Sequence, residues 1–157
     1  MICVVDKNNK IINIINADSP TRENERICYP WNSLWEQYTD VEPLEYAKQR
    51  KIMELKRQRD TAEVAPIAYN GHSFDYDDKA RDRINAAIIA LDQQGADAAI
   101  AWTTADDNDV TVTAADLRAV IATVAVRSNA LHVKYRTLKQ QVQECKTMEE
   151  LEAIKWE

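Results

Sequence analysis

The feature that most constrains this chain is an uninterrupted heptad pattern between Thr113 and Lys146. Positions of one stripe alternate in steps of four and three residues, the pattern of a helix that keeps one side against a partner. Thr113 suits an N-cap, Asp116 stands where a capping-box acid belongs, and no Gly or Pro follows Gly95. We therefore expect one long helix whose seam lies either in the core of the chain or at an interface between chains. This heptad seam consists of Leu117, Ile121, Val124, Ser128, Leu131, Tyr135, Leu138, Val142 and Cys145.

Composition restricts the class of protein. With 157 residues, 45% hydrophobic and 29% charged, the chain suits one domain or a small domain with an appendage. The net charge of −6 argues against a nucleic-acid binder, and every apolar run falls far short of the ~20 residues that cross a bilayer. The start at Met1 lacks the basic and apolar regions of a signal peptide, and the three widely spaced Cys favour a reducing cytosol. We expect neither a nucleic-acid nor a membrane partner.

The first residues predict a β-hairpin. Two β-branched runs, Ile2–Val5 and Ile11–Ile15, flank a polar turn, and residues 16–28 are polar enough to predict a loop. Two strands alone are marginally stable in water. The hairpin therefore needs another surface or another chain.

An aromatic segment follows the hairpin. Trp31 with Trp35, and Leu34 with Tyr38, stand four residues apart and would share one side of a short helix. Two interpretations stay open: a small core under the hairpin, or a patch that binds a partner, since Trp and Tyr are favoured anchors at interfaces. The candidate partner-binding residues are Tyr29, Trp31, Leu34, Trp35 and Tyr38.

The next helix, residues 42–63, has a basic centre between Lys48 and Arg59 and only a thin apolar stripe. A solvated linker helix explains this pattern. Nucleic-acid contact is the alternative, and it is not favoured because no aromatic side chains are interleaved for base stacking.

Beyond Pro66 the pattern predicts a hairpin around Asn70-Gly71, a helix at 77–94 that stops at Gly95, a second hairpin at 99–113, the long helix and a short final helix. The expected fold is therefore mainly α with small β-hairpins, an α+β class. Three parts follow from this order: an N-terminal β-hairpin and Trp-rich module at 1–41, a linker helix at 42–65, and a three-helix unit at 66–157.

Residue arrangements that would support catalysis or metal binding are missing from the sequence. His72 and His132 lie far apart and have no ligand-spaced neighbours. The acidic cluster Asp106–Asp109 matches a turn better than a Ca²⁺ loop, because Thr111 and Leu117 stand where Gly and Glu are required. We expect no enzyme activity, no cofactor and no metal.

The C-terminal half resembles a known family. The residues that carry this resemblance are Ile84–Ile88, Ile100–Asn108, Val112–Leu117 and Glu149–Trp156. Together they are similar to a domain of unknown function that recurs in bacteriophage tail proteins, notably tail-fibre components and tail-fibre assembly proteins. The family brings no catalytic residues, so the resemblance implies a setting rather than a reaction.

Within this setting, the first hypothesis is a non-enzymatic tail-fibre assembly factor, a chaperone-like protein that binds a tail-fibre polypeptide in the host cytoplasm. Within this hypothesis, the hairpin or the aromatic patch would capture an exposed segment. The alternative is a structural component of the virion tail, in which the seam or the hairpin joins copies into a homo-oligomer or docks to the fibre.

Overall fold

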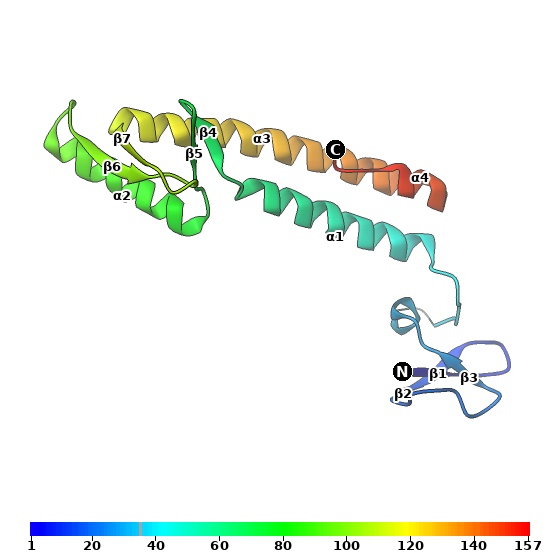
Figure 1. Ribbon diagram of the computed structural model, residues 1–157. Helices are drawn as coiled ribbons and strands as arrows, with labels where there is room; N and C mark the ends of the chain where they lie inside the picture. Colours follow the sequence, from blue (N-terminus) through cyan, green and yellow to red (C-terminus); the bar gives the residue numbers. More distant parts are fainter. Residues whose placement is uncertain (35) are drawn as a thin grey trace. The chain divides into compact units, whose positions relative to one another are not determined.

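Helices and short antiparallel strands follow one another along the chain in the order that the sequence predicts, with one further strand at Glu25–Ile27 (Figure 1). The computed structural model describes residues 1–34 and 36–157. The expected α+β class is confirmed, and the three longer helices begin and end close to their predicted bounds. The elements are β1 (Ile2–Val5), β2 (Ile11–Ile15), β3 (Glu25–Ile27), η1 (Pro30–Ser33), α1 (Leu44–Glu63), β4 (Ile67–Tyr69), β5 (His72–Phe74), α2 (Asp78–Gln94), β6 (Ala99–Thr103), β7 (Asp109–Thr113), α3 (Ala114–Glu144) and α4 (Met148–Ala153).

The chain divides into two compact units. The first unit contains Met1–Ile52 and Val142–Ile154, and the second contains Met53–Gln141 and Lys155–Glu157. The division falls inside α1 and α3, so each of these helices contributes residues to both units. Each unit has its own buried apolar residues.

The first unit contains a three-stranded antiparallel sheet in the order β2-β1-β3. Ile2 pairs with Ile15 on one side and with Ile27 on the other, and Ile2 and Cys3 are fully buried. The prediction of a loop throughout 16–28 is therefore wrong at Glu25–Ile27. The third strand supplies part of the surface that a two-stranded hairpin lacks.

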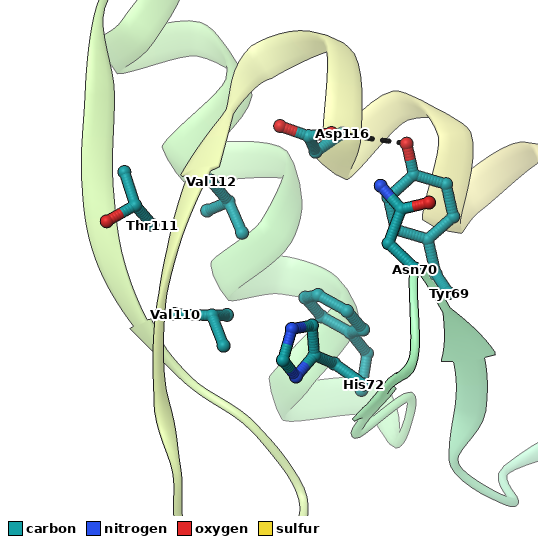
Figure 2. Close-up of a pocket in the computed structure, with 8 residues that line it drawn as sticks. Tyr69, Asn70, His72, Val110, Thr111, Val112 and Asp116 are labelled. Atoms are coloured by element: carbon teal, nitrogen blue, oxygen red, sulfur yellow. Dashed lines mark hydrogen bonds between the residues drawn. The ribbon is translucent and has the colours of Figure 1, made fainter.

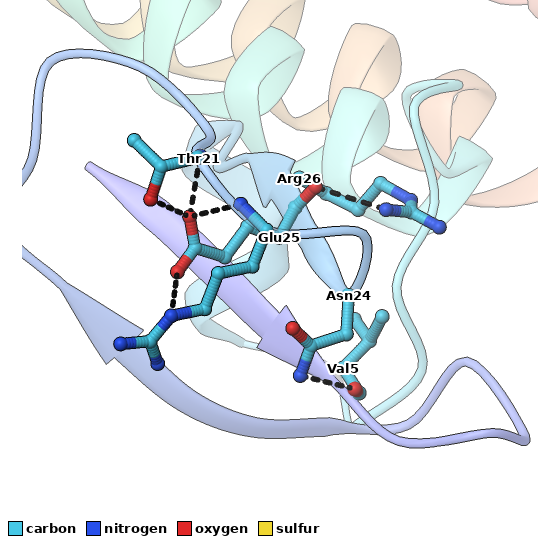
Figure 3. Close-up of polar contacts among 6 residues, drawn as sticks. Val5, Thr21, Asn24, Glu25 and Arg26 are labelled. Carbon is cyan, nitrogen blue, oxygen red and sulfur yellow. Dashed lines mark hydrogen bonds and ion pairs between the residues drawn. The ribbon is translucent and has the colours of Figure 1, made fainter.

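A buried carboxylate explains how so polar a segment joins the sheet (Figure 3). Glu25 is 5% exposed, and its Oε2 accepts hydrogen bonds from Thr21 N at 2.7 Å, Thr21 Oγ1 at 3.1 Å and Arg22 N at 3.2 Å. These bonds, led by that from the Thr21 backbone, lower the pKa of Glu25. The Asn24 carbonyl accepts from Val5 N at 2.9 Å, which ties this loop to β1. Hydrogen bonds from Thr21 and Arg22 therefore allow Glu25 to be buried in β3. A search for alternating apolar residues does not detect such bonds.

The outer edge of β2 is interrupted. Ile11 N donates to Glu36 O at 2.7 Å, while Lys10 forms a bridge with Gln37. The register passes from Val5↔Ile11 to Val4↔Asn13, so Ile12 has no strand partner and forms a bulge. Ile14 N donates a hydrogen bond to Asn13 Oδ1 at 2.9 Å. An edge interrupted in this way is a poor template for another strand.

The second unit is organised around one apolar cluster at the N-terminal end of α3. Helix α2 and both strands of the β6–β7 hairpin contribute to it, and the β4–β5 hairpin adds two side chains. In Figure 1 these elements gather at the yellow end of α3. The buried members are Ile67, Phe74, Ile84, Leu91, Trp102, Val112, Leu117, Val120 and Val124.

The C-terminal half of α1 packs beside α3 within the second unit. Leu55 is fully buried, Glu63 Oε1 accepts from Ser128 Oγ at 3.0 Å, and the Arg59 guanidinium lies 4.9 Å from the centre of the Tyr135 ring. Arg127 donates to the Glu63 and Ala65 carbonyls at 2.8 and 2.7 Å. The interpretation of 42–65 as a solvated linker does not hold for this half of α1.

The heptad seam faces the interior of the single chain. Leu117, Val124, Val142 and Cys145 are buried, and the other described seam residues are half-buried. Val142 and Cys145 belong to the first unit, and the seam residues up to Leu138 belong to the second. The sequence left two locations open for this seam, the core of the chain or an interface between chains. In the structure the seam lies inside the single chain.

Truncation of an apolar side chain of α3 should lower the free energy of unfolding strongly only where that side chain is buried. We expect Leu117→Ala to lower the free energy of unfolding by about 2–5 kcal/mol, because Leu117 is fully buried and truncation leaves a cavity. The matched control is Val126→Ala on the same helix, which should stay within about 0.5 kcal/mol because Val126 is 73% exposed. Urea unfolding followed by circular dichroism measures both, and equal losses would contradict this packing.

Glu25 should make the stability of the first unit depend on pH. Because the pKa of Glu25 is lowered by folding, its contribution is complete at neutral pH and is lost as the pH falls through the lowered pKa. We expect Glu25→Gln to destabilise the protein at neutral pH and to make a smaller difference in acid. Urea unfolding of both proteins at neutral pH and at about pH 3 tests this, with Trp fluorescence as the probe. A difference that does not shrink on acidification would contradict the role of the carboxylate.

Candidate binding site

The β4–β5 hairpin forms one wall of the candidate site. Ile67 pairs with Phe74 and Tyr69 pairs with His72, which leaves Asn70 and Gly71 as a two-residue turn. Both turn residues have positive φ, 49° for Asn70 and 78° for Gly71. A two-residue hairpin turn requires this geometry, and Asn-Gly adopts it readily. The hairpin predicted from this dipeptide is confirmed.

A pocket of about 300 Å³ lies between this hairpin and β7 (Figure 2). Consecutive side chains of a strand point in opposite directions, and in Figure 2 Val110 and Val112 point to one side of β7 and Thr111 to the other. A pocket bordered by all three therefore runs along the backbone of β7. We call it the β5–β7 pocket, and it is lined by Tyr69, Asn70, His72, Phe74, Val110, Thr111, Val112 and Asp116.

Hydrogen bonds join the β4–β5 hairpin to the elements that face it. Ala105 N, in the turn between β6 and β7, donates to Ser73 O at 2.8 Å. The Tyr69 hydroxyl donates to Asp116 Oδ1, in the first turn of α3, at 3.1 Å. These two bonds hold the walls in fixed positions, so the pocket is preformed.

Asp116 has two structural roles. Its Oδ2 accepts from Thr113 Oγ1 at 2.6 Å and from Thr113 N at 2.9 Å, while Asp116 N donates to Thr113 Oγ1 at 3.2 Å. These bonds, with the smaller effect of the Tyr69 hydroxyl, lower the pKa of Asp116. The capping box predicted at Thr113 is confirmed, and the same carboxylate holds Tyr69.

One edge of β7 is open. Hydrogen bonds between antiparallel strands alternate, and the bond from Thr104 N to Asn108 O at 2.8 Å sets their phase. By this phase, Val110 and Val112 bond to β6, while Asp109, Thr111 and Thr113 direct their backbone groups away from β6. Thr113 N is taken by Asp116. Within the part of the chain that the structure describes, no hydrogen bond reaches the backbone N–H or C=O of Thr111.

Three of the aromatic residues proposed from the sequence, Tyr29, Trp31 and Tyr38, are half-buried in the first unit. The rings of Tyr29 and Trp31 stack with 5.0 Å between their centres, and Trp31 also meets Tyr46 edge-on at 5.8 Å. Trp31 Nε1 donates to Thr39 O at 3.0 Å, and the Tyr38 hydroxyl donates to Ile27 O at 3.2 Å. Such contacts are compatible with the small-core interpretation.

Two other members of the proposed patch differ from these rings. Leu34 is 63% exposed, and Trp35 lies outside the described residues. A partner-binding role for Tyr29, Trp31, Leu34, Trp35 and Tyr38 stays a prediction.

The helical turn expected near Trp31 is shorter than the sequence suggests. It is a 3-10 turn at Pro30–Ser33, and the buried Asn32 explains its shape. Asn32 Oδ1 accepts from Tyr29 N and its Nδ2 donates to Thr39 O, both at 2.9 Å. A side chain that bonds the backbone in this way competes with helix formation.

The acidic cluster after β6 forms a turn. Asp106 accepts from Thr104 Oγ1 at 2.6 Å and from Asn108 Nδ2 at 2.8 Å, and Asp107 has a φ of 56°. Among the described residues, no group of three or more His, Cys, Asp or Glu side chains is placed to hold a metal ion. In the same part of the chain, no helix combines the length and apolar character that a membrane span needs.

Sequence reasoning identified the parts of the β5–β7 pocket separately. The Asn-Gly turn and the Thr113 cap were both recognised as local signals. Their meeting across the pocket depends on how the β4–β5 hairpin packs against β7 and α3, and neither pattern contains that information.

A comparison with protein-family models gives a match. A family model described as a domain of unknown function (DUF4376) matches residues 46–155, which is more than half of the chain. Neither the curated proteins nor the solved structures contain a significant match. The description of the matching family names no function, so the connection to phage tails stays a prediction.

Proposed function

The chain belongs to the DUF4376 family, and we propose from this premise that it is a non-enzymatic assembly factor that binds an extended segment of a bacteriophage tail-fibre protein. The open edge of β7 beside a preformed pocket carries the proposal. The expected partner follows from the resemblance, noted in the sequence, between the C-terminal half and a domain that recurs in phage tail proteins.

An extended peptide fits the chemistry of the β5–β7 pocket. A strand added beside β7 would bond to the backbone N–H and C=O of Thr111, and the pocket would receive one of its side chains. The lining offers apolar contact from Phe74, Val110 and Val112 together with polar groups from Asn70 and His72. This mixture suits the alternating side chains of a strand.

The contrast between the two units supports the choice of site. The outer edge of β2 is interrupted by a bulge, by a bridge to Gln37 and by the Asn13 side chain. The edge of β7 at Thr111 has no such protection. Since proteins usually cover or interrupt free edges, an open one beside a pocket favours a binding role.

Location in infected cells tests the function. We expect mass spectrometry to find this chain in the lysate, in complex with a tail-fibre protein, and to find none in purified particles. The reason is that an assembly factor leaves before the particle is complete. Presence in particles at a fixed stoichiometry would overturn the proposal and favour the alternative, a structural component of the tail.

A change at the open edge tests the site. We expect Thr111→Pro to abolish capture of the fibre protein in a pull-down, because Pro removes the free N–H and places its ring at the edge. The matched control is Thr111→Ala, which keeps the N–H and should bind like the wild type. Thermal unfolding confirms that both variants are folded. Normal capture by a folded Thr111→Pro variant would exclude strand addition at β7.

A further inference from the structure

A second cavity, of about 340 Å³, lies in the second unit beside α3. Its lining comes from Arg59 of α1 and from one face of α3, and it is separate from the β5–β7 pocket. We call it the α3 groove. It is lined by Arg59, Asn129, His132, Val133, Tyr135, Arg136 and Lys139.

Three cationic side chains, Arg59, Arg136 and Lys139, line the α3 groove, and one of them already has a partner. Arg59 forms an ion pair with Asp60, and His132 Nε2 lies 3.3 Å from Glu63 Oε1. Arg136 and Lys139 have no hydrogen bond or ion pair with any residue that the structure describes. They stand three positions apart, so they share one face of the helix. The groove therefore presents two free positive charges side by side.

We propose that the α3 groove binds an acidic segment of a partner protein through Arg136 and Lys139. Asn129, His132, Arg136 and Lys139 follow one another along a single face of α3 over about 15 Å. A segment with carboxylates about one helical turn apart would meet both free cations. This site is independent of the β5–β7 pocket and of the proposed function.

Protein carboxylates fit the α3 groove better than nucleic acid does. The Asp60 and Glu63 carboxylates contact Arg59 and His132 of the lining, and the chain carries a net charge of −6, so a dense phosphate polymer would be repelled. Of the two aromatic rings in the lining, Tyr135 faces the Arg59 guanidinium at 4.9 Å, and His132 Nε2 lies 3.3 Å from Glu63 Oε1. Each of these rings already has a partner, which makes the groove a poor platform for base stacking.

Apolar surface next to the free cations supports a protein partner. Val133 in the groove is 44% exposed, and Val126, two helical turns away on α3, is 73% exposed. Thr137 Oγ1 donates to Val133 O at 3.1 Å, so its hydroxyl is engaged with the helix backbone. A partner helix with acidic residues beside an apolar stripe would match this arrangement.

Binding of a labelled peptide tests this inference. The probe is a fluorescein-labelled helical peptide rich in Glu, compared with the same peptide carrying Gln, and fluorescence anisotropy measures affinity for the full chain. We expect the Arg136→Gln/Lys139→Gln variant to bind the Glu peptide about tenfold more weakly, because each lost charge removes one ion pair. The matched control is Lys56→Gln/Arg57→Gln, two exposed residues of α1 whose change removes the same charge.

The control variant should bind like the wild type, and the Gln peptide should bind weakly to all three proteins. Equal losses in the two double variants would overturn the proposal, because they would show only general charge attraction. Absence of wild-type binding to the Glu peptide would also overturn it. Displacement of the peptide by duplex DNA or by inorganic phosphate at lower concentration would replace it with a phosphate site.

Discussion

Burial of the heptad seam is the interaction on which most of this structure depends. At the N-terminal end of α3, Leu117 and Val124 of the seam, with the neighbouring Val120, join the core formed with α2 and β6–β7. Each fully buried aliphatic side chain of this kind contributes about 1.5–3 kcal/mol. Farther along the helix, Ser128 bonds to Glu63 and Tyr135 lies under Arg59, which fixes the C-terminal half of α1. The long helix is therefore the surface on which shorter elements of the second unit are assembled.

The two units differ in whether the edges of β2 and β7 are interrupted or open. In the first unit, a bulge, a bridge and a side-chain bond interrupt β2, and β1 is covered on both sides. In the second unit, the sheets have two strands each, and the edge of β7 at Thr111 stays open beside the β5–β7 pocket. Because unsatisfied backbone groups attract other strands, this difference makes the second unit the better candidate for capturing an extended segment.

Positive charge is concentrated at one place in this acidic chain. The chain is acidic as a whole, yet the α3 groove places Arg136 and Lys139 beside Arg59 and His132. The basic centre of α1, noticed in the sequence as a feature without a role, supplies Arg59 to this groove. Positive charge that is scattered along two segments becomes a local feature only because those segments lie together in the fold.

The sequence by itself determined the elements whose causes are local. Spacing along α3, the Thr113 cap and the Asn70-Gly71 turn each predicted a structure that the fold contains, because helix periodicity, capping and turn geometry act within a few residues. Tertiary structure alone decided what depends on distant neighbours. It placed Glu25 among Thr21 and Arg22 so that β3 could form, turned the ring of Trp31 toward Tyr46, and directed the heptad seam inward. Burial and pairing across the chain set these outcomes, and a one-dimensional pattern does not contain them.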